Sequence, residues 1–389
     1  MRKFIAITMT LLILSNAYLL YSNYSLKKDV LQEQTTSTPK KKNFMSMMIE
    51  TEAGSGKYQV SSSNTWPTDG YVFNNELSKC EQGSKLSWDD TNKKVVMEGN
   101  VSDKCYVYFD KHVPTVSEYI ISKYNGTQGE NGLYYHDSNL TNGAGDNSYR
   151  YAGASADVNN YICLGSNEVT CPEDNLYRII GVFGDNNHGI TEEQLVKVIK
   201  NTSLGDMAWN STRNNNWCYA TLNETLNTTF ITEKLSGLGD KISNAQWKTA
   251  GYSTSNVTSK VFYMQEINDT TKTCNLKIGL MYLSDYGFAA DQSNWTKTIY
   301  NSSSANYNWL YVDTGQWSIS AYSTDSNYVW NVLSSGFING NYVTNSNGTY
   351  PSFYLTSSVQ YSSGSGTSTD PIRIKWYILT LQILFVKLF

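Results

Sequence analysis

The chain has 389 residues and a formal net charge of −4, with 40% hydrophobic but only 16% charged side chains. This hydrophobic content allows a packed core, while the low charge leaves Asn, Ser, Thr and Gly to form the polar surface, unlike that of a typical cytoplasmic enzyme. Because Lys and Arg gather nowhere into a broad basic face, the composition disfavours nucleic acid as a partner.

The first segment, residues 1–24, is predicted to be a signal anchor or a signal peptide. Arg2 and Lys3 precede an almost wholly apolar run over 4–21, close to the roughly 20 residues that a membrane helix needs. The two basic residues favour keeping the amino end inside the cell. We therefore expect a single-pass protein of the cell membrane, anchored by this N-terminal helix, with the bulk of the chain extracellular.

Cleavage is the alternative interpretation of the same segment. Ser15 and Ala17 are small residues at the spacing that signal peptidases use, so cleavage after Ala17 would give a secreted protein. It would leave an apolar sequence at the new terminus, and for that reason we favour the anchor. Both interpretations place the remaining chain outside the cytoplasm.

A polar linker and a small β module are predicted next. Residues 25–44 have no apolar periodicity and contain three consecutive lysines, so we expect a disordered linker. Residues 45–112 contain short β-prone runs separated by turn formers, at 57–60, 70–73, 85–88, 93–97 and 105–109. This pattern predicts an all-β module whose small core would need a disulfide staple.

Residues 113–147 are predicted to be a connector. Residues 116–124 favour a short helix, and a Gly/Asn-rich passage follows. Its glycines do not form a phosphate loop, because no Lys-Ser/Thr pair and no strand–loop–helix frame accompany them. The alternating acidic ligands of a calcium loop are also missing.

The largest predicted unit, residues 148–374, combines strands with one helical insert. Runs at 149–151, 161–163, 175–183, 194–200, 277–284 and 351–356 favour strands, while apolar residues between 217 and 240 recur at helical spacing. Residues 241–247 favour a second short helix or an edge strand. The order predicts an α+β domain. Residues 375–389 form an atypical apolar tail. This tail is consistent with an altered reading frame, an extra strand or an adhesive apolar end.

The cysteines agree with an oxidising compartment. Their number is even, and none forms a C-x-x-C pair, so we expect three disulfides and no zinc site. The sequence does not fix the connectivity; we expect sequential pairs, each within one predicted unit, namely Cys80–Cys105, Cys163–Cys171 and Cys218–Cys274. The three histidines lie at no metal-ligand spacing from a cysteine, so neither a metal nor a cofactor is expected.

Several short motifs occur in one order along the chain, at 148–153, 159–163, 175–181, 279–285, 351–355 and 362–371. As an ordered set they resemble an uncharacterised domain family of exported proteins from host-associated Gram-positive bacteria. The smaller module resembles the β module that often precedes that domain. By weaker analogy, the resemblance implies a C-type-lectin-like or sulfatase-modifying-factor-like fold. The calcium-ligand motif of C-type lectins is incomplete at Trp330-Asn331-Val332, which lacks the acid, so calcium-dependent sugar binding is not expected.

A non-catalytic binding or adhesion module is the predicted function, with a glycan or a host or envelope protein as ligand. Aromatic side chains on disulfide-held loops suit stacking on sugar rings or anchoring a protein. The candidates for ligand binding are Trp295, Trp309, Trp317 and Trp330. The competing interpretation places these tryptophans in the core, where tryptophan is usually largely buried.

The sequence is also consistent with two other functions. An exported hydrolase would have to draw its two carboxylates from Asp285, Asp291, Asp313 and Asp325. No spacing singles out a pair, and no nucleophile elbow, zinc-binding His-Glu-x-x-His or Cys/His constellation is present, so no catalytic residue is assigned. The third interpretation is a structural spacer in the cell envelope.

Overall fold

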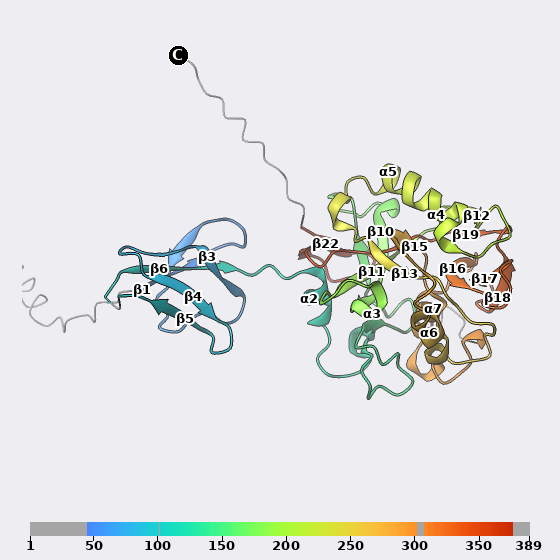
Figure 1. The fold of residues 1–389 in the computed structure, drawn as a ribbon, viewed down its shortest axis with the longest axis horizontal. Coiled ribbons are helices and arrows are strands. Elements are labelled where there is room, and N and C mark those ends of the chain that lie inside the picture. Colours follow the sequence, from blue (N-terminus) through green and yellow to red (C-terminus); the bar gives the residue numbers. More distant parts are fainter. Residues whose placement is uncertain (1–44, 101, 302–306, 376–389) are drawn as a thin grey trace, which may run out of the picture. The chain divides into compact units, whose positions relative to one another are not determined.

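A computed structural model describes residues 45–100, 102–301 and 307–375 (Figure 1). It contains 33% strand and 18% helix, which is compatible with an α+β or a mainly β protein. The chain divides into two compact units after His112. The predicted membrane segment 1–24, the linker 25–44 and tail residues 376–389 lie outside the described residues. Among those described, none of the helices has the length and apolarity that a membrane span requires.

The first unit is built from six short strands. Four of them form a sheet in the order β2-β1-β6-β3, and β4 and β5 form a separate antiparallel pair. The strands are β1 (Met45–Glu50), β2 (Tyr58–Val60), β3 (Tyr71–Cys80), β4 (Lys85–Asp89), β5 (Lys94–Glu98) and β6 (Cys105–Lys111).

Strand β6 supplies the core of the first unit. It alternates strictly, so that Cys105, Val107 and Phe109 are buried while the residues between them are not. Trp88 packs edge-on against the Phe109 ring, 5.6 Å between ring centroids. Cys80 and Cys105 face each other in the β3–β6 pairing and form a disulfide, as the sequence predicted.

The second unit is organised around a mixed sheet of nine strands. The main path runs β15-β20-β11-β10-β9-β22-β21, and β7 and β8 join through β10. The strands are β7 (Leu133–Tyr135), β8 (Tyr149–Tyr151), β9 (Tyr161–Cys163), β10 (Leu176–Phe183), β11 (Leu195–Lys200), β15 (Ile278–Gly279), β20 (Ser352–Tyr354), β21 (Tyr361–Ser363) and β22 (Ile372–Ile374). In β10 and β11 nearly every residue is buried, as in a sheet covered on both faces.

Smaller sheets and short helices surround this sheet. The remaining strands are β12 (Asp206–Ala208), β13 (Ala245–Lys248), β14 (Thr273–Leu276), β16 (Gln316–Ala321), β17 (Tyr328–Val332), β18 (Ile338–Tyr342) and β19 (Ser346–Gly348). They pair as β12-β19, β13-β14 and β16-β17-β18. The α-helices are α2 (Val116–Ile121), α3 (Asp185–His188), α4 (Thr221–Thr225), α5 (Ile231–Lys234), α6 (Ser259–Asn268) and α7 (Leu283–Phe288).

Single helical turns complete the unit. The turn η4 (Leu226–Phe230) is π-helical and joins α4 to α5, so helical structure runs through most of the segment in which the sequence showed helical spacing. The 3₁₀ turns are η1 (Glu130–Gly132), η2 (Glu173–Asn175), η3 (Trp217–Tyr219), η5 (Gly239–Lys241), η6 (Gln292–Asn294) and η7 (Ile299–Asn301).

Two segments differ from the sequence-based expectation. The expected connector 113–147 belongs to the second unit: β7 pairs with β8, and Val116, Ile120 and Leu133 are core residues. The expected strand at 277–284 is wrong beyond Gly279, because α7 begins at Leu283. Asp285 starts this helix by accepting a hydrogen bond from the backbone N–H of Tyr282, and a buried apolar run does not reveal such a cap.

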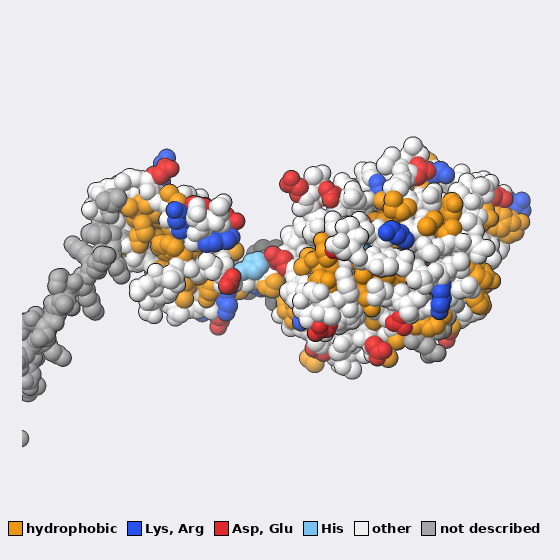
Figure 2. Space-filling model, turned by 90° about the horizontal axis from the view of Figure 1, so that it is seen from below, with side chains coloured by type: hydrophobic (Ala, Val, Ile, Leu, Met, Phe, Trp, Pro, Cys, Tyr) orange, Lys and Arg blue, Asp and Glu red, His pale blue; other side chains and the backbone are white. Residues whose placement is uncertain are grey.

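The surface is mostly uncharged. Figure 2 shows a face on which white polar and backbone atoms predominate, with charged side chains scattered singly. This is the surface that a composition low in Lys, Arg, Asp and Glu predicts.

Candidate ligand-binding site

The four candidate tryptophans are buried, with exposed fractions between 0% and 4%, so their proposed role as an exposed ligand platform is wrong. Each indole N–H donates to a backbone carbonyl: Trp295 to Ala290, Trp309 to Tyr151, Trp317 to Met207 and Trp330 to Tyr252. Burial of a large aromatic surface with its single polar group satisfied is the stable outcome for tryptophan.

The structure also does not gather these tryptophans into one surface. Trp295 packs against Phe288 and His136 in a small cluster of its own. Trp309 and Trp330 belong to the main core, where Trp330 contacts Phe262 edge-on. These aromatic side chains hold the loops in place and leave no common face for a ligand.

The four candidate carboxylates are equally dispersed. Asp285 is 2% exposed and is paired with Lys197. Asp325 accepts hydrogen bonds from the backbone and side chain of Asn327 and so caps a turn. Burial raises the pKa of Asp291, and Asp313 is exposed on a different loop. Among the described contacts, none joins two of these acids, so the geometry gives no support to a two-carboxylate hydrolase.

Among the described residues of the second unit, Tyr219 has the most exposed aromatic side chain, at 81% exposure. It ends the 3₁₀ turn η3, which Asn216 caps by accepting a hydrogen bond from the Cys218 N–H. Two residues earlier, Trp217 is fully buried against Trp209, with ring centroids 5.0 Å apart. The buried ring anchors the turn, and its geometry directs Tyr219 to the solvent.

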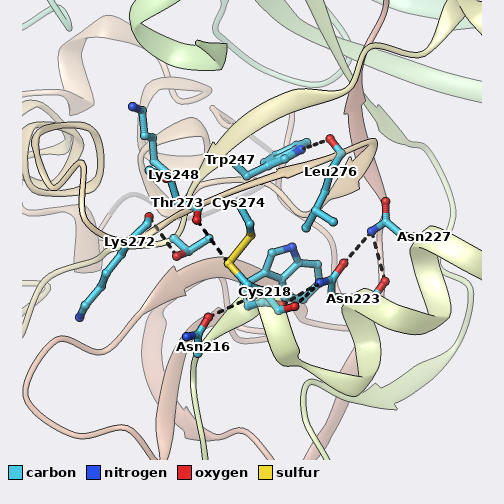
Figure 3. The surroundings of a disulfide bond; sticks show 12 residues. Asn216, Cys218, Asn223, Asn227, Trp247, Lys248, Lys272, Thr273, Cys274 and Leu276 are labelled. Atoms are coloured by element: carbon cyan, nitrogen blue, oxygen red, sulfur yellow. Dashed lines mark hydrogen bonds between the residues drawn. A yellow bond between two sulfur atoms is a disulfide. The ribbon is translucent and has the colours of Figure 1, made fainter.

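A disulfide fixes this turn to the antiparallel strand pair β13–β14 (Figure 3). Cys218 in η3 is bonded to Cys274 in β14, and Cys274 is paired in register with Trp247 of β13. Figure 3 shows Lys248 and Lys272 on one side of the bond and Asn223 and Asn227 on the other. The bond is the one that the sequence predicted, as is Cys163–Cys171.

Beside the disulfide lies a pocket of about 350 Å³. Its lining is dominated by amide and hydroxyl side chains around the disulfide and Tyr219: Asn215, Asn216, Thr249, Thr271, Lys272, Thr273 and Ala321. The backbone of this lining is held firmly, because the Lys272 carbonyl accepts from both the N–H and the hydroxyl of Thr249. The Asn215 side chain in turn donates to the carbonyls of Tyr322 and Tyr328.

The electrostatics of this pocket are simple. Its lining contains one cation, Lys272, which is exposed, and no carboxylate. The neighbouring Lys248 is 7% exposed and donates to the side chain of Gln246. Burial lowers the pKa of Lys248 because the ammonium loses its hydration. The pocket therefore offers hydrogen-bond donors and acceptors beside an exposed ring, and its lining supplies no acid for proton transfer.

A second hollow lies beside the loop that precedes β16. A wide groove of about 720 Å³ shares Tyr311 and Tyr350 with a small pocket of about 120 Å³ that reaches Arg178. Arg178 is stacked between the rings of Tyr161 and Trp309, at 4.2 and 4.8 Å from their centroids. Its guanidinium also donates to Asn160, Ser155 and Val158. Arg178 therefore holds the segment 155–161 against the loop that carries Trp309.

Tyr219 was not predicted from the sequence as a site residue, although the adjoining Cys218–Cys274 disulfide and the helical spacing that begins at residue 217 were. The segment 214–219 reads Asn-Asn-Asn-Trp-Cys-Tyr, and either aromatic residue could face the core. Only the turn geometry decides that Trp217 is buried and Tyr219 exposed. The cysteine between them was the available signal, since a disulfide fixes the direction of its neighbours.

No protein-family model, curated protein or solved structure matches this chain.

Proposed function

We propose that this chain is an extracellular, membrane-anchored binding module whose second unit takes a carbohydrate segment in the pocket beside Cys218–Cys274. The observation that carries the proposal is the 81%-exposed Tyr219 ring, held at the rim of a pocket of about 350 Å³ by a disulfide and a capped turn. The disulfide and the cap hold the backbone that carries Tyr219, and a tyrosine side chain has only two torsions to fix, so binding loses little conformational freedom.

The lining chemistry favours a sugar over an apolar ligand. The apolar face of a pyranose ring stacks on an aromatic side chain, while its hydroxyls take hydrogen bonds from amides, hydroxyls and ammonium groups. Asn216, Thr271 and Lys272 supply these three kinds of polar group. The absence of a carboxylate from the lining favours binding without hydrolysis.

The test is binding of the full chain to a glycan array, followed by titration calorimetry with the best ligand. Tyr219→Ala should weaken binding about fivefold or more, because loss of a stacking aromatic contact costs about 1–3 kcal/mol. Tyr300→Ala is the matched control: Tyr300 is also exposed, at 42%, but lies outside the pocket lining. Equal affinity of the two variants for every glycan bound would refute the assignment of the pocket.

The extracellular location is supported by the disulfides. All six cysteines form bonds, two of which tie loops within the second unit. Such bonds persist in oxidising compartments and are rare in the cytosol. A membrane-impermeant protease should degrade the second unit on intact cells, and a thiol-alkylating reagent should label none of the six cysteines without prior reduction. A protease-protected chain with free thiols would contradict the proposed location.

A further inference from the structure

Lys197 and Asp285 form a fully buried contact pair in the second unit. The Lys197 Nζ lies 2.6 Å from the Asp285 Oδ2, and the side chains are 0% and 1% exposed. Lys197 comes from the central strand β11 and Asp285 from the first turn of α7, 88 residues further along the chain. The fold thus brings an amine and a carboxyl group together in a place that water does not reach.

The Lys197 amine lies among aromatic rings. Its Nζ is 3.9 Å from the ring centroid of Tyr282, 5.1 Å from that of Trp247 and 5.6 Å from that of Tyr354. Burial lowers the pKa of Lys197, the Asp285 carboxylate opposes this shift, and the neighbouring charge of Arg150 adds to it. The net lowering favours the neutral amine, which is the nucleophilic form.

The Asp285 carboxyl group is held asymmetrically. Its Oδ2 accepts a hydrogen bond from the backbone N–H of Tyr282 at 2.8 Å. Its Oδ1 has no hydrogen-bond partner among the described residues, although Arg150 Nη1 lies 3.5 Å away. A backbone N–H and a guanidinium directed at the same carboxyl group stabilise negative charge that develops on its oxygens.

The side chain of a second acid, from helix α6, contacts the first residue of α7. Glu266 of α6 is 0% exposed, and its Oε1 accepts from the backbone N–H of Leu283 and from the hydroxyl of Ser320. Its Oε2 has no hydrogen-bond partner within the described part of the chain. Burial raises the pKa of Glu266 to about 7, so near neutral pH a large share of this acid is uncharged, which leaves the charges of Arg150, Lys197, Asp146 and Asp285 balanced.

We propose that Lys197 and Asp285 condense to form an intramolecular amide bond that joins β11 to α7. One proton first passes from the Lys197 ammonium to the Asp285 Oδ2, which it contacts at 2.6 Å, and this leaves a neutral amine and a carboxylic acid. The Nζ then attacks the Asp285 Cγ, and negative charge develops on Oδ1, 3.5 Å from the Arg150 Nη1. A second proton moves from Nζ to Oδ2, the Cγ–Oδ2 bond breaks, and water leaves.

The step needs no co-reactant. The Lys197 ammonium and the Asp285 carboxylate become one amide and one water, and no atom is oxidised or reduced. In bulk water this condensation is unfavourable, but a fixed contact replaces a bimolecular encounter. Well-oriented intramolecular reactions reach effective concentrations on the order of 10⁵–10⁸ M. The aromatic rings around Nζ also keep out the water that would reverse the reaction.

The wild-type full chain tests the proposal without any substitution. After complete reduction and denaturation, its intact mass should be lower than the sequence mass by one water. Trypsin should then yield a branched peptide in which 179–200 is joined to 278–297, because the acylated Lys197 no longer directs cleavage. A full sequence mass together with separate peptides would overturn the proposal.

Matched variants test the residues. Lys197→Met should restore the full mass, whereas Lys200→Met, a change of another buried lysine on the same strand, should retain the loss of water. Retention of the water loss in Lys197→Met, or its disappearance in Lys200→Met, would overturn the assignment of the bond to Lys197.

Discussion

The buried His136 gives the second unit a defined dependence of stability on pH. It is 0% exposed, its Nδ1 accepts the Ala144 N–H at 3.0 Å, and its Nε2 has no hydrogen-bond partner among the described residues. The rings of Phe288 and Trp295 lie 5.0 Å from it. Protonation would place a proton on Nδ1, abolish the bond from Ala144 and bury a positive charge.

The pKa of His136 is accordingly held well below its usual value of 6.5. Burial is the main cause, the charge of Arg150 adds to it, and Asp146 opposes it. In the unfolded chain the same histidine binds a proton below pH 6.5, while in the folded chain it does not. The effect of His136 on the free energy of unfolding is therefore negligible well above pH 6.5, and below it the free energy falls with a slope that approaches about 1.4 kcal/mol per pH unit.

The assay is urea unfolding of the wild type and of His136→Gln at pH 7.5, 6.5 and 5.5. Gln retains an acceptor for the Ala144 N–H but does not titrate. The wild-type advantage in free energy of unfolding should shrink by about 0.4 kcal/mol from pH 7.5 to 6.5 and by about a further 1 kcal/mol from pH 6.5 to 5.5. Burial also lowers the pKa of His188, but its contribution cancels in the difference. A wild-type advantage independent of pH would refute this reasoning.

Two further predictions concern the core and a disulfide. Trp317→Ala should lower the free energy of unfolding by about 3–5 kcal/mol, because it empties a fully buried site, whereas Tyr219→Ala should change it by no more than about 0.5 kcal/mol. Urea unfolding measures both, and similar losses would contradict the burial assigned to the two rings. Cys80→Ala/Cys105→Ala should lower the free energy of unfolding of the first unit by about 3 kcal/mol, since the bond closes a loop of 25 residues. An unchanged urea midpoint for that unit under oxidising conditions would show that the staple is not needed.

Local patterns predicted those parts of the fold that depend on local sequence. The alternation at 105–109 predicted β6, and the runs at 149–151 and 161–163 coincide with β8 and β9. The disulfide pairing was also predicted, because each pair lies within one predicted unit. Features that depend on contacts distant in sequence were not predicted. Residues 133–135 read as part of a connector, since their partner strand β8 begins 14 residues after β7 ends.

The candidate site illustrates the same division. The disulfide beside the pocket was predicted, but the aromatic side chain available to a ligand was not. The sequence identified aromatic residues without showing on which side of a turn each would lie. Tyr219 and the candidate tryptophans differ in exposure because of packing: each tryptophan finds a backbone carbonyl for its N–H inside the core, whereas Tyr219 follows Trp217 in a turn that can bury only one of them.

The buried charges of the second unit connect its folding to the proposed amide bond. Buried charges meet here from 146–150, 197, 266 and 285, and an uncompensated charge among them would cost several kcal/mol. They are those of Asp146, Arg150, Lys197, Glu266 and Asp285. They balance only when Glu266 is protonated, as its raised pKa favours. Condensation of Lys197 with Asp285 removes one charge of each sign and leaves Arg150 paired with Asp146 at 2.7 Å. The bond would thus preserve neutrality in the core while converting a costly ion pair into a permanent link between β11 and α7.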